Sequence, residues 1–358
     1  MNELEIVRIH DMLRNARARG ASDVHFGGTD RAVIRIDGSL IALEEPNISE
    51  ATLNEFCEST MNPAALERLR NRGTADGTLR SESGANRIHA FRHIGGIRVV
   101  VRLLPTIVPT LESLHLPAVL GALAGSPSGL LLFSGPAGSG KTTALAATID
   151  RINRTQARTV VTVEDPVEYV HAPIRSIVTH CEIGRDVSDY AEAVRGFMRA
   201  DPNVISIGEM RDAETMEAAL AAAETGHLVL ATLHTSDAPQ TIDRILDGFP
   251  GGRQTQVRTQ LAAALLAVFG LRLVPLAKGS GRTTAAEIMI ASDAVRALVR
   301  DGKTHQLRNT IATARSAGMQ TLESHLSELV VHGTITADAA RSVANRPQDV
   351  QALHREAV

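Results

Sequence analysis

The sequence GLLLFSGPAGSGKTTALAA, residues 129–147, joins a short apolar run to a glycine-rich turn and then to a helical pattern. The turn matches G-x-x-x-x-G-K-[ST] and stands between a predicted strand and a predicted helix, as a phosphate-binding P-loop requires. Backbone N–H groups of such a loop point at phosphate oxygens, and the start of the helix adds partial positive charge. We therefore expect a nucleotide site here, not a chance glycine-rich turn.

Each P-loop position has an expected role. Lys141 should reach the β- and γ-phosphates of ATP, and the Thr142 hydroxyl should bind Mg²⁺. The residues expected to hold the nucleotide are Gly135, Pro136, Ala137, Gly138, Ser139, Gly140, Lys141, Thr142 and Thr143.

The pattern around the P-loop predicts an α/β fold. The apolar runs LLLF, TVVTV, VISI and LVLATL alternate with helical patterns that start at Lys141 and lie near 188–199, 212–224 and 237–247. Strands that alternate with helices form a mostly parallel sheet covered on both faces. We assign residues 118–285 to this domain.

The rest of the chain divides into three further parts. Residues 1–104 combine a helix near 3–18, a hairpin at Asp37-Gly38, a helical stretch over 49–71 and two more strands, which indicates a smaller α+β domain. Three prolines mark residues 105–117 as an extended linker. Residues 286–358 form a C-terminal helical region, with helices predicted near 293–300, 304–317, 319–332 and 336–345.

Composition excludes several classes. The chain has 358 residues, a net charge of −3, 3% aromatic residues and no Trp, so it lacks the basic and stacking surface of a nucleic-acid-coating protein. We expect no nucleic-acid partner. Two cysteines support neither a disulfide framework nor a four-cysteine zinc site. The charged start and the short apolar run over 261–271 predict a cytoplasmic protein without a membrane span.

Two acidic groups follow predicted strands. Glu209 comes after VISI and Gly208, at the strand end where ligands bind in open α/β sheets, and Gly208 permits close approach. Because a P-loop precedes it in the chain, we favour a functional role for Glu209 over that of a surface glutamate. The expected role is catalysis or binding of Mg²⁺, through a bridging water. Glu164 begins EDPVE after TVVTV and could polarise water, bind Mg²⁺ or only face solvent. The residue pattern leaves these alternatives open.

His227 and His234 flank the run LVLATL. Their odd separation puts them on opposite faces of a regular strand, so they do not form one metal site. One of them could sense the γ-phosphate, while a structural role is the default for either alone.

Taken in order, the P-loop, VEDPVEY, VISIGE and HLVLATLH resemble the motifs of the secretion and type IV pilus hexameric ATPases, and GASDVHF resembles the N-terminal domain of that family. The resemblance implies a PAS-like N-terminal domain, a RecA-like motor domain and a homo-hexamer that hydrolyses ATP with Mg²⁺. It makes Glu164 and Glu168 acidic-box residues, Glu209 the catalytic carboxylate, and His227 and His234 the histidine-box pair, with His234 nearer the γ-phosphate.

Two features indicate the PilT-like retraction branch. A four-cysteine zinc module, usual in assembly ATPases, is ruled out by the cysteine count, and AVRALVRD at 294–301 resembles the AIRNLIRE signature. The resemblance implies a motor for pilus retraction and twitching, located at the cytoplasmic side of the inner membrane at the pilus base. Its implied partners are an inner-membrane platform protein and other pilus ATPases. The alternatives are a secretion-system or accessory pilus ATPase and, less favoured, a nucleic-acid translocase.

The resemblance also implies a role for two arginines of the N-terminal domain. Arg87 and Arg102, in RIHAFRHIGGIRVVVRLL, correspond to residues that approach nucleotide phosphates in related motors. Arginine suits this role because its planar fork binds phosphate oxygens bidentately and stays charged. The alternative is a pair of arginines on a solvated sheet face.

Overall fold

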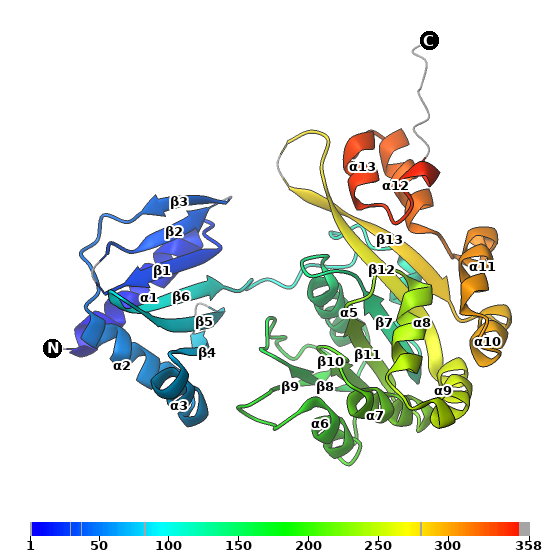
Figure 1. The fold of residues 1–358 in the computed structure, drawn as a ribbon, viewed down its shortest axis with the longest axis horizontal. Coiled ribbons are helices and arrows are strands. Elements are labelled where there is room, and N and C mark those ends of the chain that lie inside the picture. The colour runs from blue at the N-terminus through cyan, green and yellow to red at the C-terminus, as the bar shows by residue number, and fades with distance from the viewer. Residues whose placement is uncertain (1, 29, 37, 82–83, 280, 351–358) are drawn as a thin grey trace, which may run out of the picture. The chain divides into compact units, whose positions relative to one another are not determined.

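The computed structural model describes residues 2–28, 30–36, 38–81, 84–279 and 281–350. The chain forms two compact units, the first from Met1–Ile107 with Pro166–Val170 and the second from Val108–Asp165 with His171–Val358. Each unit has its own hydrophobic core. Each also has its own sheet, as Figure 1 shows.

The first unit is built on a six-stranded antiparallel sheet. Its strand order is β3 (Ser39–Ala42), β2 (Val33–Ile36), β1 (Asp23–Gly27), β6 (Gly96–Leu103), β5 (Gly84–His93) and β4 (Thr74–Ser81). Burial alternates along β6, where Ile97, Val99 and Val101 are fully buried, as expected when one face of a sheet packs on a core. The helices α1 (Asn2–Ala18), α2 (Glu50–Thr60) and α3 (Pro63–Arg72) complete that core.

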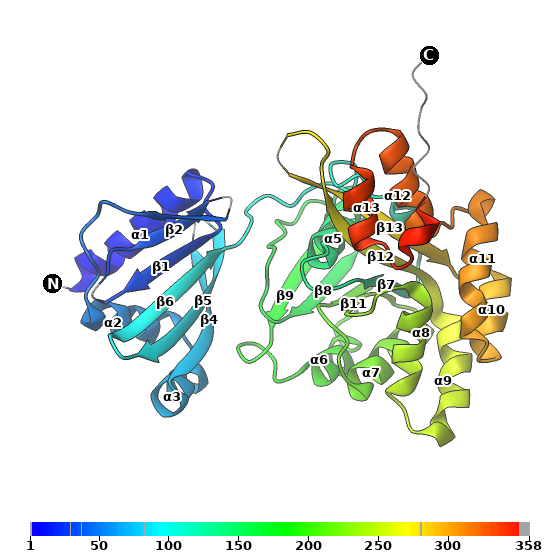
Figure 2. The same cartoon turned by 45° about the horizontal axis from the view of Figure 1, so that its top comes forward.

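The second unit contains a seven-stranded sheet, seen from two directions in Figures 1 and 2. Its strand order is β13 (Arg282–Ile290), β12 (Leu265–Pro275), β7 (Gly129–Ser134), β11 (Leu228–Leu233), β10 (Val204–Ile207), β8 (Thr159–Glu164) and β9 (Ile177–Glu182). Only β13 runs antiparallel to its neighbour; the others are parallel. β7 and β11 are buried along their whole length because both faces are covered.

Helices cover the two faces of this sheet. Leu131 and Phe133 belong to one core cluster with α4 (Ala118–Leu123) and α5 (Lys141–Thr155). Leu130 and Leu132, which point the other way, belong to a second cluster with α6 (Tyr190–Phe197), α7 (Ala213–Glu224), α8 (Ala238–Asp247) and α9 (Gly251–Ala264). That second cluster also contains residues of α10 (Asp293–Arg300) and α11 (Leu307–Thr313). The P-loop strand therefore lies in the centre of the core.

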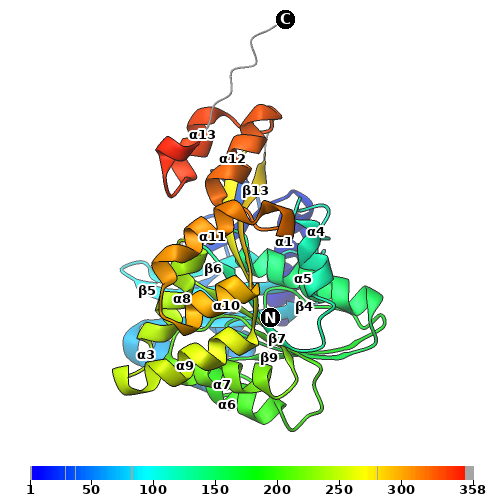
Figure 3. The same cartoon turned by 90° about the vertical axis from the view of Figure 1, so that its right-hand side faces the viewer.

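The last helices, α12 (Leu322–Val331) and α13 (Ala337–Val343), pack beside the β12–β13 pair (Figure 3). Their core cluster includes Val274 of β12 and Ala285 of β13. Short 3₁₀ turns connect the C-terminal helices at Thr304–Gln306 and Arg315–Ala317, and another at Pro347–Asp349 follows α13. The C-terminal helices thus pack on the sheet that carries the P-loop.

Local sequence explains most helix starts. The side chains of Asp189, Asp212, Asp237 and Ser292 each accept a hydrogen bond from a backbone N–H three residues later. Such N-caps satisfy donors that the helix itself leaves unpaired. They fix where α6, α7, α8 and α10 begin.

The predicted α/β architecture, with a smaller N-terminal domain and C-terminal helices, is confirmed. The predicted strands are β7, β8, β10 and β11, and the predicted C-terminal helices correspond to α10 to α13. The stretch over 49–71 forms two helices, because the first helix ends at its C-cap Met61 and the second begins after its N-cap Asn62. The sequence patterns did not predict β4, β9, β12, β13, α4 or α9.

The predicted linker and C-terminal boundary differ in detail from the structure. Residues 111–115 form turns, and Leu111 and Leu116 are buried in the core of the second unit. The segment 105–117 is therefore extended only in part, because its leucines pack on that core. The expected boundary after residue 285 falls within β13, so the strand crosses it. The exact domain limits stay a prediction; Asp37 of the predicted hairpin lies outside the described residues.

Candidate nucleotide site

The P-loop runs from the end of β7 to the start of α5. Gly135 has φ 147°, and a Cβ there would lie 2.4 Å from Ser139 Oγ and 2.6 Å from the Leu271 carbonyl oxygen. Only glycine fits this position, because L residues avoid that φ and the space is occupied. The P-loop backbone is therefore closely packed around Gly135, as expected for a loop whose backbone N–H groups bind phosphate.

Lys141 occupies the centre of this loop. Its Nζ donates to the carbonyl oxygens of Gly135 (2.7 Å) and Pro136 (2.9 Å) and lies 3.4 Å from His234 Nδ1. Burial lowers the pKa of Lys141 to about 8. The loop also buries the Ser139 hydroxyl, for which the described residues supply no hydrogen-bond partner. A buried cation and a spare donor inside a glycine loop fit a phosphate group.

Four parallel strands bring their carboxyl ends to the same edge of the sheet. Gly135 follows β7, Glu164 ends β8, Glu209 follows β10 and His234 follows β11. The register pairs Ile207 with both Val163 and Ala231, and Leu233 with Ser134. The structure thus gathers the P-loop, both acidic positions and one histidine, as the strand-end argument predicts.

Glu209 is held by its neighbours on β11. Thr232 Oγ1 donates to the Gly208 carbonyl (2.5 Å), and Met210 N donates to the Thr232 carbonyl (3.0 Å). A Cβ on Gly208 would lie 3.2 Å from Glu164 Cα, so glycine permits the close approach that the sequence predicted. The Glu209 carboxylate lies 2.7 Å from Arg211 Nη2 and 3.4 Å from His234 Nε2.

Glu164 is part of a hydrogen-bonded network. Thr162 Oγ1 donates to Glu164 Oε1 (2.8 Å) and lies 3.0 Å from His180 Nδ1 on the neighbouring strand β9. His180 Nε2 accepts from the His171 backbone N–H (3.1 Å), which places the proton of a neutral imidazole on Nδ1. His180 therefore donates to Thr162, which donates to Glu164. This network orients the carboxylate at the strand end.

The two predicted histidines lie at opposite ends of β11. His234 follows the strand and contacts both Lys141 and Glu209. His227 precedes it, with Nδ1 2.9 Å from the Ala222 carbonyl near the end of α7. His227 therefore has a hydrogen-bond partner within its own chain, and its action on a nucleotide stays a prediction.

Three predicted site residues belong to the first unit. Arg87 and Arg102 are paired directly in the β5–β6 register, and Glu168 lies in Pro166–Val170. Arg102 Nε donates to Asp23 Oδ1 (2.9 Å), and Arg87 Nη2 lies 3.8 Å from Asp76 Oδ1. Both arginine side chains remain about half exposed or more. Their action on a nucleotide stays a prediction, as does that of Glu168.

Comparison with known proteins identifies the family of this chain. Residues 2–352 match the family described as Type II/IV secretion system protein. The chain belongs to this family. It is 38% identical over 342 residues to the type IV pilus retraction ATPase PilT of Pseudomonas aeruginosa. The aligned region covers 95% of this chain and 99% of the relative.

Two further matches extend the comparison. A twitching motility protein of Neisseria gonorrhoeae is 39% identical over 319 residues, covering 89% of this chain and 85% of the relative. The crystal structure of the pilus retraction motor PilT with bound ADP has a TM-score of 0.87 and 37% identity, over 95% of this chain and 97% of that one. This family member is therefore similar to retraction motors over nearly its whole length.

The structure adds residues that sequence patterns did not single out. Tyr190 begins α6, and a Cβ on Gly208 would lie 3.4 Å from its hydroxyl. Burial raises the pKa of Tyr190, and the charges of Asp165, Glu209 and Glu164 add to that shift. Neither Tyr190 nor His180 stands in a recognisable motif, and only tertiary packing brings them to this edge.

None of the helices in the described ranges is long and apolar enough to cross a membrane.

Proposed function

We propose that this secretion-family protein is a hexameric ATP-hydrolysing motor that powers type IV pilus retraction. The observation that carries the proposal is the contact of Lys141 and Glu209 with the same histidine, His234, at the P-loop edge of the sheet. A phosphate-binding cation, a carboxylate and a polar sensor are the parts that phosphoryl transfer to water requires. Similarity to PilT over 95% of the chain supports retraction as the task.

The chain's own residues have distinct roles in this proposal. Lys141 binds the β- and γ-phosphates, and Thr142 and Glu209 are the residues that would hold Mg²⁺. Mg²⁺ would neutralise charge on the transferred phosphoryl group. Glu209 or Glu164 orients and deprotonates the attacking water. His234, whose ring contacts both Lys141 and Glu209, faces the γ-phosphate.

Assembly would complete the site. Arg87 and Arg102 act as arginine fingers at a subunit or domain junction of the ring, where their guanidinium groups stabilise charge in the transition state. The ring would bind an inner-membrane platform protein and act with other pilus ATPases at the cytoplasmic face of the pilus base.

A deletion strain complemented with the parent gene or with Lys141→Ala tests the function. We expect the deletion to leave excess pili that do not retract, the parent to restore twitching, and Lys141→Ala to fail. Purified Lys141→Ala should lack ATPase activity and keep the parent circular dichroism spectrum, since Lys141 contacts loop carbonyls and does not belong to the apolar core. Loss of all pili in the deletion strain would indicate an assembly ATPase instead.

A further inference from the structure

The loop that carries His234 is held by groups outside the nucleotide site. This loop, residues 234–237, leads from β11 to α8. The Ser236 carbonyl accepts from Arg272 Nη2 (2.8 Å) and from Asn345 Nδ2 (3.3 Å), and Arg272 Nη2 also donates to Asn345 Oδ1 (3.1 Å). These three groups form a closed triangle, which we call the Ser236 clamp.

Arg272 connects the clamp to the P-loop. It lies on β12 with 9% of its surface exposed, and its Nη1 donates to the Leu271 carbonyl (2.9 Å), the oxygen that blocks a Cβ at Gly135. The next residue, Leu273, would contact a Cβ on Gly140 at 3.6 Å. The β12 segment 271–273 therefore lies directly against the P-loop. The positive charge of Arg272 adds to burial in lowering the pKa of Lys141.

The far end of the loop is fixed as well. Glu287 Oε1, on β13, accepts from the backbone N–H of Ala238 (2.6 Å), the first residue of α8. Glu287 is only 2% exposed. The two antiparallel strands β12 and β13 thus anchor the His234 loop at two points.

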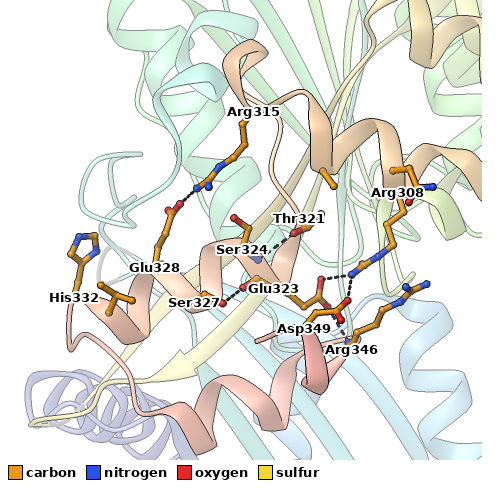
Figure 4. Close-up of a pocket in the computed structure, with 13 residues that line it drawn as sticks. Arg308, Arg315, Thr321, Glu323, Ser324, Ser327, Glu328, His332, Arg346 and Asp349 are labelled. Atoms are coloured by element: carbon orange, nitrogen blue, oxygen red, sulfur yellow. Dashed lines mark hydrogen bonds and ion pairs between the residues drawn. The ribbon is translucent and has the colours of Figure 1, made fainter. Parts of the chain in front are cut away.

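Asn345 belongs to the C-terminal helical region. The next residue, Arg346, donates its backbone N–H to Glu323 Oε1 of α12 (2.9 Å). Arg308 of α11 bridges Glu323 Oε2 (3.1 Å) and Asp349 Oδ2 (2.9 Å), and Glu323 is only 2% exposed. Figure 4 shows these side chains converging on the same segment, at a pocket of about 700 Å³. The segment 345–349 is therefore tied to α11 and α12.

We infer that Arg272 and Asn345 are positioning residues that hold His234 for γ-phosphate recognition and couple the nucleotide state to the C-terminal helices. The inference rests on the proposed function, because it takes His234 as the γ-phosphate sensor. When His234 moves toward a γ-phosphate, the Ser236 carbonyl moves with it, and Asn345 with its C-terminal segment must follow or lose a hydrogen bond. The coupling is reciprocal, so displacing the segment weakens ATP binding as well.

The chemistry of the clamp explains why arginine is used. Arg272 serves three acceptors, on Leu271, Ser236 and Asn345, from two nitrogens of one rigid plane. A lysine ammonium at the same place could not span them, because its donors share one nitrogen. A neutral glutamine would serve fewer still. The positive charge of the guanidinium also offsets the negative charge of the nearby carboxylates of Glu287, Asp237 and Glu323. Burial lowers the pKa of Arg272, and these three carboxylates act in the opposite direction.

Nucleotide binding to Asn345→Ala tests the inference. We expect the Kd for fluorescent ATPγS to rise about three- to tenfold and kcat to fall by a similar factor, as for one lost hydrogen bond, while the Kd for fluorescent ADP stays within about twofold. A purely structural defect would weaken both nucleotides and lower the melting temperature. Equal losses for the two nucleotides, or parent values for both, would overturn the inference. The control is Ser342→Ala on α13, whose hydroxyl donates to the Ala339 carbonyl of its own helix (2.8 Å), and this variant should match the parent.

A double-mutant cycle and hydrogen exchange provide independent tests. Arg272→Gln combined with Asn345→Ala should cost little more than Arg272→Gln alone, because both side chains act on one carbonyl. In the parent hexamer, amides of residues 343–350 should exchange more slowly with ATPγS than with ADP. Additive losses, or identical exchange in the two states, would refute the coupling. If the parent binds ATPγS but hydrolyses no ATP, the proposed function fails while the exchange experiment still decides the coupling.

Discussion

Glu209 Oε1 lies 3.4 Å from His234 Nε2, and the other ring nitrogen of His234 lies 3.4 Å from Lys141 Nζ. The lysine ammonium can only donate, so Nδ1 accepts and the ring proton belongs on Nε2, facing Glu209. One imidazole therefore bridges the phosphate-binding cation and the carboxylate. A γ-phosphate that draws Lys141 away would free the Nδ1 side of the ring, so ligand binding and the Glu209 environment are linked.

The first prediction concerns Glu209→Gln. The variant should keep ATP affinity but lose hydrolysis by ~10²–10⁴, because the change preserves shape and removes the base that activates water. Single-turnover hydrolysis and equilibrium ATP binding, measured on the same preparation, check both parts. Parent-rate hydrolysis would transfer the role of general base to Glu164.

The second prediction uses the pKa of Lys141, which burial lowers from 10.5 to about 8 without nucleotide. Bound phosphates favour the charged ammonium, so above pH 8 binding must take up a proton. ATP affinity should be flat below pH 8 and fall toward about tenfold per pH unit above it. Calorimetry in two buffers of different ionisation enthalpy should report proton uptake at pH 9 but not at pH 7.

Stability without nucleotide should change in the opposite direction. The folded pKa of Lys141 lies below its unfolded value, so the unfolded state binds more protons between pH 8 and 10.5, and the Lys141 contribution to stability rises with pH there. The difference in melting temperature between the parent and Lys141→Met isolates this term. ATP affinity independent of pH from 7 to 9.5 would contradict the buried-lysine account.

The third prediction tests the Glu164 network with Thr162→Val. The valine keeps the shape and removes the hydroxyl between His180 and Glu164, so both lose a partner. We expect kcat to fall about tenfold, which corresponds to about 1.4 kcal/mol of activation free energy, with KM for ATP little changed. Thr159→Val, at the other end of β8, is the matched control and should retain the parent kcat. Equal rates in the two variants would show that the Thr162 hydroxyl does not position Glu164 for turnover.

The strand ends of this site could be predicted from sequence because local patterns fix them. Apolar runs predict β7, β8, β10 and β11, and the residues after them must meet at one edge of a parallel sheet. The glycine spacing predicts the loop at Gly135 without knowledge of any partner. Glu209 and His234 were found in this way.

Residues that act through tertiary contacts could not be predicted. β9 is a half-exposed edge strand with a weak apolar pattern, so His180 gave no signal. The apolar run over 261–271 changes from helix to strand at Leu265, and periodicity alone does not separate a buried strand from a buried helix. Arg272 therefore stood in a segment without an assigned element, and its link to Asn345 spans 73 residues.

The last prediction concerns ring assembly. Arg87 and Arg102 are direct cross-strand partners in antiparallel register, so both side chains emerge on the same face of the β5–β6 pair. If that face supplies fingers to a nucleotide at a junction, the site is complete only in the closed ring, and turnover per subunit should rise with protein concentration until hexamers form. Arg102→Ala should lower kcat far more than it weakens ATP binding, because a finger acts on transition-state charge. Loss of a lone finger costs ~10³–10⁵ in other NTPases, and we expect less here because two arginines share the charge.

Matched variants separate the finger role from a lost ring. Arg102→Lys should rescue only in part, since a point charge cannot reproduce the bidentate fork. Arg92→Ala, an exposed arginine an odd number of positions from Arg87 on β5 and therefore on the other face, should retain the parent kcat. Sedimentation of each variant at the assay concentration shows whether hexamers persist. A monomeric parent whose ATPase activity neither depends on concentration nor responds to Arg87→Ala or Arg102→Ala would end the ring-motor interpretation, because no part of the active site would then come from another subunit.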